Sequence, residues 1–433
     1  MRAARVRGLL SVLSGLRLAM PASAQPETID AFARDATAGL NARSFYMDVE
    51  DRSRPGPTTQ KQAWALGGKL WALSGWWRDM LQLGASYYLS APLHAPADKD
   101  GTGLLAPGQD TISVLGEAFA RLKLGPAKLT AGRQEIDMAY PRAAGVRANR
   151  SDVTYVGRQD NRMVPITYEA VLLDGRMDKR LNYYLGWIDK AKPRNLSEFQ
   201  PVGTVFGAKG SDADMWFGGV QFSPANEVWL QGWVHGVPDV IRIGWIDADA
   251  VLRLAESRHL RIAGQVSDQR SDGAALLTGS AFSTRNAQAY AEAGLGNWTL
   301  YGALSRTGSG ANLSNPLSSG PIYTQQLVRA FVRAHESAWQ LGAAIDFSLW
   351  APGVSAFVDA TRGTGAIDPA TGIRLADETE LDIGALWVYR ASGSWFDGLR
   401  SRIRWATVTD SNAAGDRRST DLRIDFNLPF SLR

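Results

Sequence analysis

The sequence predicts an all-β fold, a transmembrane antiparallel β-barrel of about 18 strands that occupies residues 25–433 as one domain. Three observations predict it. Segments of about ten residues alternate apolar and polar side chains along most of the chain, as in outer-membrane barrels. After residue 24 there is no run of about 18 apolar residues that would form a membrane-spanning helix. The N-terminus also has the features of an export signal.

The N-terminal 24 residues are predicted to be a signal peptide. Arg2, Arg5 and Arg7 form a basic start, residues 8–20 are mostly apolar, and Ala22-Ser23-Ala24 fits an A-x-A cleavage site. The formal charge of +4 comes from 47 basic and 43 acidic residues, and this segment holds four of the arginines. Cleavage would therefore leave a neutral protein. Because no excess of basic residues remains, we expect no nucleic-acid partner. The export signal together with the barrel strands predicts a location in the bacterial outer membrane.

Period-2 alternation indicates eighteen strands. They are expected at residues 39–50, 62–72, 80–89, 113–124, 127–136, 168–174, 180–188, 214–223, 226–237, 240–253, 260–269, 283–295, 298–306, 338–349, 354–361, 381–390, 399–407 and 420–428. The connections alternate between short turns, as at 124–127, 223–225 and 351–353, and long polar loops, as at 91–112, 307–337 and 363–379. This asymmetry is typical of short periplasmic turns and of long loops that are extracellular or fold inward.

The last strands show two clearly different faces. In 420–428 an apolar face is opposite a polar one that holds Asp421, Arg423 and Asp425. In 399–407 the apolar face holds Leu399, Ile403 and Trp405, and the other face holds Arg400, Arg402 and Arg404. Because an arginine in contact with lipid near mid-membrane costs about 2–4 kcal/mol, the arginines are predicted to face the lumen. There they would attract anions; the simpler alternative is that they only keep the wall hydrated.

The stretch 132–169 interrupts this regular pattern and is a candidate functional segment. Long irregular connections within a regular β-fold often carry binding residues. After the GRQEIDM segment, its arginines are Arg142, Arg147, Arg150, Arg158 and Arg162, and its aspartates are Asp152 and Asp160. An ordinary solvated loop is the alternative interpretation.

Enzyme and cofactor signatures are weak or absent. The chain has no cysteine, which excludes disulfides and thiolate metal sites. The four histidines are scattered, without metal-ligand spacing. A G-x-G-x-x-A match at Gly101 has no helix behind it, as dinucleotide binding requires. We therefore expect no enzyme activity, no catalytic residue, no metal and no cofactor.

Several motifs resemble the OprD-type outer-membrane porins, which are substrate-selective. They are DKDGTGLLAPGQDTISVL at 98–115, GRQ at 132–134, DNRMVPITYE at 160–169, AWQL at 338–341 and the final PFSL at 429–432. The resemblance covers most of the chain after residue 24. Two features depart from the family pattern: residues 139–156 form an insertion between the GRQ and DNRM motifs, and Arg433 follows the last strand.

The resemblance implies an eighteen-stranded barrel, monomeric or trimeric, that passes small anionic or zwitterionic solutes passively across the outer membrane. Carboxylates and amino acids are the expected solutes, and membrane lipid would surround the barrel. It also implies a lumenal arginine ladder, for which Arg400, Arg402, Arg404 and Arg423 are the candidates. Asp160, Arg162 and Tyr168 match the loop motif and are the other candidates for the substrate pathway.

A second function remains open at this point. The 15 tryptophans could stack on sugar rings, and paired carboxylates could act as acid and base, as in a secreted or outer-membrane β-protein that binds or cleaves carbohydrate or lipid. No catalytic constellation in the sequence supports it.

Overall fold

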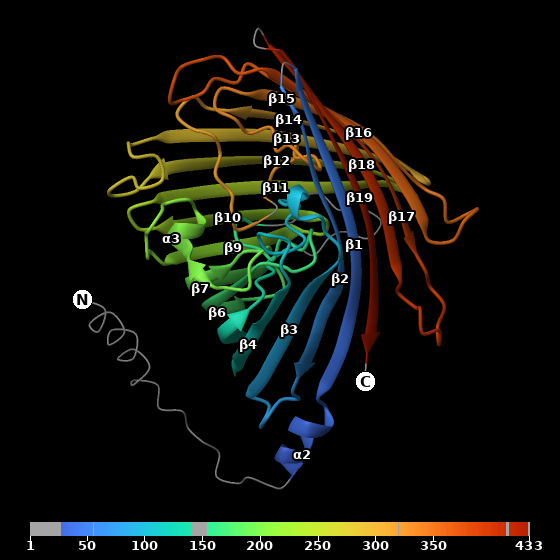
Figure 1. Ribbon diagram of the computed structural model, residues 1–433. Helices are drawn as coiled ribbons and strands as arrows, with labels where there is room; N and C mark the ends of the chain where they lie inside the picture. Colours follow the sequence, from blue (N-terminus) through green and yellow to red (C-terminus); the bar gives the residue numbers. More distant parts are fainter. Residues whose placement is uncertain (1–26, 55, 140–153, 319, 413–414, 432–433) are drawn as a thin grey trace.

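Figure 1 shows the computed structural model, a closed antiparallel β-barrel with loops folded into its interior. It describes residues 27–54, 56–139, 154–318, 320–412 and 415–431. The first nine long strands are β1 (Thr37–Arg54), β2 (Thr58–Leu73), β3 (Leu81–His94), β4 (Ile112–Leu124), β5 (Ala127–Gln134), β6 (Thr167–Arg176), β7 (Leu181–Lys192), β9 (Met215–Ala225) and β10 (Val228–Val237).

The remaining nine complete the barrel. They are β11 (Ile241–Ala255), β12 (Arg258–Ser271), β13 (Ser283–Leu295), β14 (Trp298–Thr307), β15 (Ser337–Asp346), β16 (Val354–Thr364), β17 (Asp377–Val388), β18 (Arg400–Asn412) and β19 (Gly415–Ser431). Four short elements accompany them: α2 (Glu27–Arg34), η1 (Ala97–Lys99), β8 (Gln200–Pro201) and α3 (Val202–Val205).

The barrel closes because the last long strand pairs with the first. β19 lies antiparallel to β1, with Gly39 opposite Ser431 and Arg54 opposite Asp416. Each long strand pairs with its neighbours in sequence, and β7 pairs directly with β9 while the two-residue β8 adds to one end of β7. A closed sheet leaves no strand edge with unpaired backbone groups in the lipid.

The predicted strands are confirmed in number and position. Each of the eighteen predicted segments overlaps one long strand, and many of these strands extend a few residues further at one or both ends. The turn expected at 223–225 is wrong by two residues: β9 continues to Ala225, and Asn226 and Glu227 make the turn. The N-terminal lead contains the helix α2, which period-2 patterning does not detect. The predicted signal peptide, residues 1–24, lies outside the described part of the chain.

The two faces of the strands separate as the alternation predicts. Ile403 and Phe426 are 48% and 46% exposed on the outer surface. Asp421, Arg423 and Asp425 of β19 are buried on the inner side, where they contact other charged groups. Lipid covers the outer face in a membrane, so apolar residues are stable there, while the charged residues face the interior.

An apolar core inside the barrel fixes the inward-folded loops to one wall. Tyr155, Val156 and Ile166 of the loop between β5 and β6 are buried together with Trp233 and Trp245 of β10 and β11. Leu317, from the loop between β14 and β15, belongs to the same core. The loops therefore pack mainly on the side of the lumen formed by β6–β11. They also contact the other wall, through Arg43 of β1 and Arg423 of β19.

No helix among the described residues is long and apolar enough to cross a membrane. The predicted insertion at 139–156 falls largely outside the description, since residues 140–153 are not described. The predicted Arg142, Arg147, Arg150 and Asp152 lie in that gap.

Candidate functional site: a charged constriction

Residues 154–166, here called the constriction loop, run across the lumen before the chain enters β6. Backbone contacts fix its ends: the Ile166 amide donates to the Arg158 carbonyl at 2.7 Å. The buried ammonium of Lys192 donates to the Pro165 carbonyl at 2.9 Å. These contacts place Arg158, Asp160 and Arg162 in the interior of the barrel.

Tyr168 supports the constriction loop from behind instead of lining the pathway. Its ring is fully buried, and its hydroxyl oxygen lies 2.6 Å from the Gly157 carbonyl and 2.7 Å from the Leu317 carbonyl. It thus joins two inward-folded loops. The assignment of Tyr168 to the substrate pathway is corrected here, because a side chain without exposed surface cannot contact a passing solute.

We expect Tyr168→Phe to lower the free energy of unfolding by about 1–3 kcal/mol, because the Gly157 carbonyl loses the hydroxyl that donates to it. Ion selectivity should not change, since the hydroxyl does not reach the lumen. The midpoint of denaturant unfolding and the reversal potential measure the two effects. Tyr184→Phe is the control, because the Tyr184 hydroxyl donates to Gln221 in the wall at 3.1 Å and not to a loop. Unaltered stability, or altered selectivity, in Tyr168→Phe would contradict this assignment.

Arg43 of β1, which was not among the predicted residues, attaches the constriction loop to the opposite wall. Its guanidinium makes two bonds to the Asp160 carboxylate, at 2.6 and 3.1 Å. It also donates to the Arg162 carbonyl at 2.7 Å. Burial acts to raise the pKa of Asp160, but the charge and hydrogen bonds of Arg43 outweigh it, so the pKa is lowered overall. Asp160 therefore stays charged and holds the contact.

The arginines of β18 and β19 line the inner wall but are partly neutralised by neighbouring aspartates. Arg402 donates to Asp425 at 2.9 and 3.1 Å, and Arg404 reaches the same carboxylate at 3.4 Å. Arg423 pairs with Asp421 at 2.6 Å. Carboxylates of β19 thus lie between the guanidiniums of the predicted ladder and reduce their mutual repulsion.

Arg400 differs from the other arginines of this wall. Within the described part of the chain it makes no ion pair or hydrogen bond, and its Nε atom is buried without a partner. Its nearest charged neighbours include Arg402, Asp425 and Arg43. A guanidinium without a carboxylate of its own is the most available donor for an anion in the lumen.

Arg162 and Arg194 add positive charge on the loop side. The Arg162 guanidinium, 8% exposed, donates to the Thr102 and Asn161 carbonyls at 3.1 and 3.0 Å. Arg194 donates to the Asn161 side chain at 2.7 Å. Burial lowers the pKa of Arg162 well below its usual range, and the nearby Arg423 and Arg194 lower it further. The pKa of Arg194 falls to about 10, chiefly because the side chain is buried and also because Arg423 is nearby.

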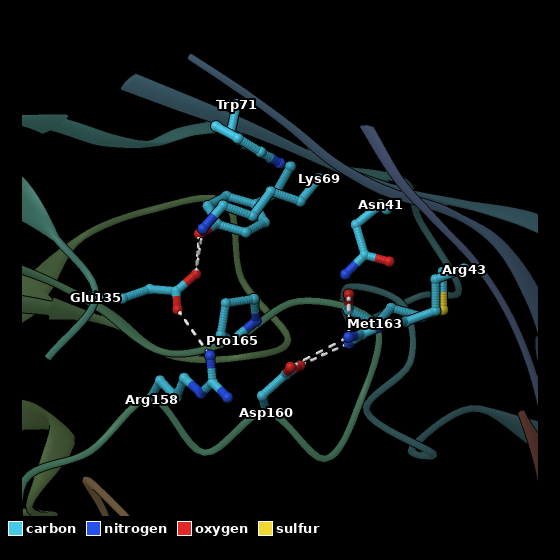
Figure 2. Close-up of a pocket in the computed structure, with 11 residues that line it drawn as sticks. Asn41, Arg43, Lys69, Trp71, Glu135, Arg158, Asp160, Met163 and Pro165 are labelled. Atoms are coloured by element: carbon cyan, nitrogen blue, oxygen red, sulfur yellow. Dashed lines mark hydrogen bonds and ion pairs between the residues drawn. The ribbon is translucent and has the colours of Figure 1, made fainter. Parts of the chain in front are cut away.

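Two cavities lie on either side of the constriction loop. The inner cavity, of about 240 Å³, is lined by Arg43, Lys69, Arg158, Glu135 and Asp160 (Figure 2). It lies near the first residues of β1, since Asn41 also lines it. The outer cavity, of about 660 Å³, lies toward the long loops. It holds five basic side chains, Lys61, Arg162, Arg194, Arg404 and Arg423, against two acidic ones, Asp100 and Asp421.

Two glutamates lie beside Lys69 at the inner cavity, and one of them, Glu135, lines it. Glu117 and Glu135 each accept a bond from the Lys69 ammonium at 2.7 Å. Arg158 lies 3.6 Å from Glu135 on its other side (Figure 2). The one hint of these residues in the sequence is the position of Glu135 directly after the GRQ motif. Cations and carboxylates therefore face the same space, as recognition of a zwitterion requires.

The site contains binding groups for charged solutes. The described residues hold no cluster of three or more histidines, aspartates or glutamates arranged to bind a metal ion.

A closed eighteen-stranded barrel with a charged constriction inside it defines an outer-membrane porin. The family model for outer membrane porins of the OprD family matches residues 30–432, so the chain belongs to that family. It is a passive channel of the bacterial outer membrane. Membership favours this function over the alternative of a carbohydrate- or lipid-binding protein. Comparison with curated proteins finds no match.

Solved porin structures share the fold. OccK9 (OpdG) of Pseudomonas aeruginosa superposes with a TM-score of 0.79 at 24% identity, over 92% of this chain and 100% of that one. OpdK of the same organism, crystallised with vanillate, gives 0.76 at 21% identity over 92% and 100%. OccK2 (OpdF), in complex with glucuronate, gives 0.73 at 19% identity over 93% and 100%.

Proposed function

We propose that this porin selects small carboxylates, including the zwitterionic carboxylates of amino acids. The observation that carries the proposal is the excess of positive charge on both sides of the constriction loop. The outer cavity has five basic and two acidic side chains, and the inner cavity has three basic and two acidic ones. Such an excess raises the local concentration of anions next to the constriction loop.

The arginines suit transfer of a carboxylate from one site to the next. A guanidinium binds a carboxylate with two parallel hydrogen bonds, which fixes its orientation. Arg402, Arg404 and Arg423 already share aspartates of the wall, so each binds a passing anion only weakly. Weak binding at several adjacent sites allows a solute to enter and also to leave.

In this proposal the pathway residues are Arg400, Arg402, Arg404, Arg423, Arg43, Asp160 and Arg162. Glu135 and Asp160 face the inner cavity and would accept hydrogen bonds from the ammonium group of an amino acid. The vanillate and glucuronate bound by two structural neighbours are both carboxylates, which supports the solute class.

The test is electrical recording from the folded protein, without residues 1–24, in a planar lipid bilayer. Reversal potentials are measured across gradients of potassium chloride, acetate, benzoate and glucuronate. We expect stepwise conductance, a preference for anions over potassium, and passage of the organic carboxylates. Channels that insert and conduct but prefer potassium in all four salts would refute carboxylate selection.

A further inference from the structure

An apolar groove crosses the outer wall of the barrel over β9–β12. It consists of two adjoining depressions, of about 910 and 410 Å³, which share Val220, Gly232, Ile246 and Val266. These residues face outward, where lipid surrounds the barrel. β9–β13 form the far wall of the barrel in Figure 1, away from β1 and β19.

Three glycines form the floor of the groove, and no contact within the chain requires glycine at these positions. A Cβ atom on Gly244 would meet no other atom within 4 Å, and on Gly232 or Gly264 it would meet none closer than 3.8 or 3.7 Å. None of the three has a positive φ angle. Gly219 and Gly236 differ, because a Cβ there would collide with Trp233 or Trp216. The absence of side chains at the first three positions keeps the groove open to an external molecule.

Two arginines mark the long-loop end of the groove. Arg270 of β12 and Arg285 of β13 line it and are largely exposed, and both contact Asp268, at 2.6 and 2.8 Å. Two guanidiniums share one carboxylate, so one positive charge remains uncompensated. Long loops of outer-membrane barrels face outward, which places this charge at the level of the outer-leaflet headgroups.

We propose that this groove binds an outer-leaflet lipid with a phosphate headgroup. One acyl chain lies in the depression above Gly232, Gly244 and Gly264, and the phosphate contacts Arg270 and Arg285. An apolar channel with a cation at one end matches the division of such a lipid into tail and anionic head. The inference depends on the position of the barrel in the membrane and not on the proposed solute.

The experiment uses the folded full barrel in detergent micelles and measures bound lipid by native mass spectrometry. The probes are diphosphorylated lipid A and phosphatidylcholine, which is zwitterionic. We expect the parent to retain lipid A in preference to phosphatidylcholine. Arg270→Gln combined with Arg285→Gln should weaken lipid A binding about tenfold or more. Gly244→Leu combined with Gly264→Leu should weaken the binding of both lipids, because leucines fill the groove.

Matched controls are available on other parts of the outer surface. Ala85→Leu adds the same side chain on β3, and Arg362→Gln removes an exposed arginine of β16; neither should alter lipid binding. Equal binding of the two lipids by the parent, or unaltered binding in the glutamine variant, would overturn the proposal. A third result would also overturn it: the parent forms a stable oligomer, and Gly244→Leu dissociates this oligomer without any loss of lipid. A second barrel would then occupy the groove in place of a lipid. The parent and the glutamine variant decide the question even where the leucine variants do not fold.

Discussion

Replacement of both Arg402 and Arg404 by alanine is expected to lower carboxylate flux about tenfold and to shift the reversal potential toward cation preference. The two guanidiniums share Asp425, so the local charge changes from +1 to −1 when both are removed. Barrel assembly should persist, because water in the lumen replaces the lost side chains and the lipid-facing residues are unaltered. Bilayer recordings and heat-dependent electrophoretic mobility measure the two properties.

The matched control is Arg402→Ala combined with Asp425→Ala. This variant removes one charge of each sign from the same wall and leaves Arg404 in place, so the net charge and the anion preference should be retained. If the double-arginine variant instead keeps the permeability ratio and carboxylate flux of the parent, these arginines only hydrate the wall.

Replacement of Arg43 by glutamine is expected to release the constriction loop and to raise single-channel conductance. Arg43 donates to Asp160 and to the Arg162 carbonyl, and hydrogen bonds to charged groups contribute about 2 kcal/mol. A loss of that size shifts an equilibrium between a held and a released loop about thirtyfold. Conductance and current noise in symmetric potassium chloride report the release.

Asp160→Asn separates loop release from a simple change of charge. It also weakens the contact with Arg43, so conductance should rise in both variants, although their effects on the net charge are opposite. Opposite conductance changes in the two variants would show that charge alone acts.

In the parent, the lowered pKa of Asp160 means that the contact is present at neutral pH and is lost only on acidification through that pKa. Parent conductance should therefore be constant from about pH 8 to pH 5.

Strand number and strand faces could be predicted because their signal is local. Adjacent residues of a strand point to opposite sides, so Ile403 and Arg402 are assigned to lipid and lumen by their order alone. The constriction loop was also placed correctly as an interruption of that pattern. The role of Tyr168 was wrong because a motif match does not show whether a side chain faces the lumen or the core behind the loop.

The sequence by itself determined a closed barrel, its lipid-facing surface and an inner wall rich in arginine, because alternation and polarity act over neighbouring residues. The tertiary structure decided which charges neutralise one another. Strand register sets Arg402 opposite Asp425, and loop packing brings Asp160 to Arg43, 117 residues away in the chain. Such contacts depend on how distant segments meet, and Coulomb energy falls with distance in space, not in sequence. The anion selection that we propose for this channel therefore depends on contacts that only the folded lumen provides.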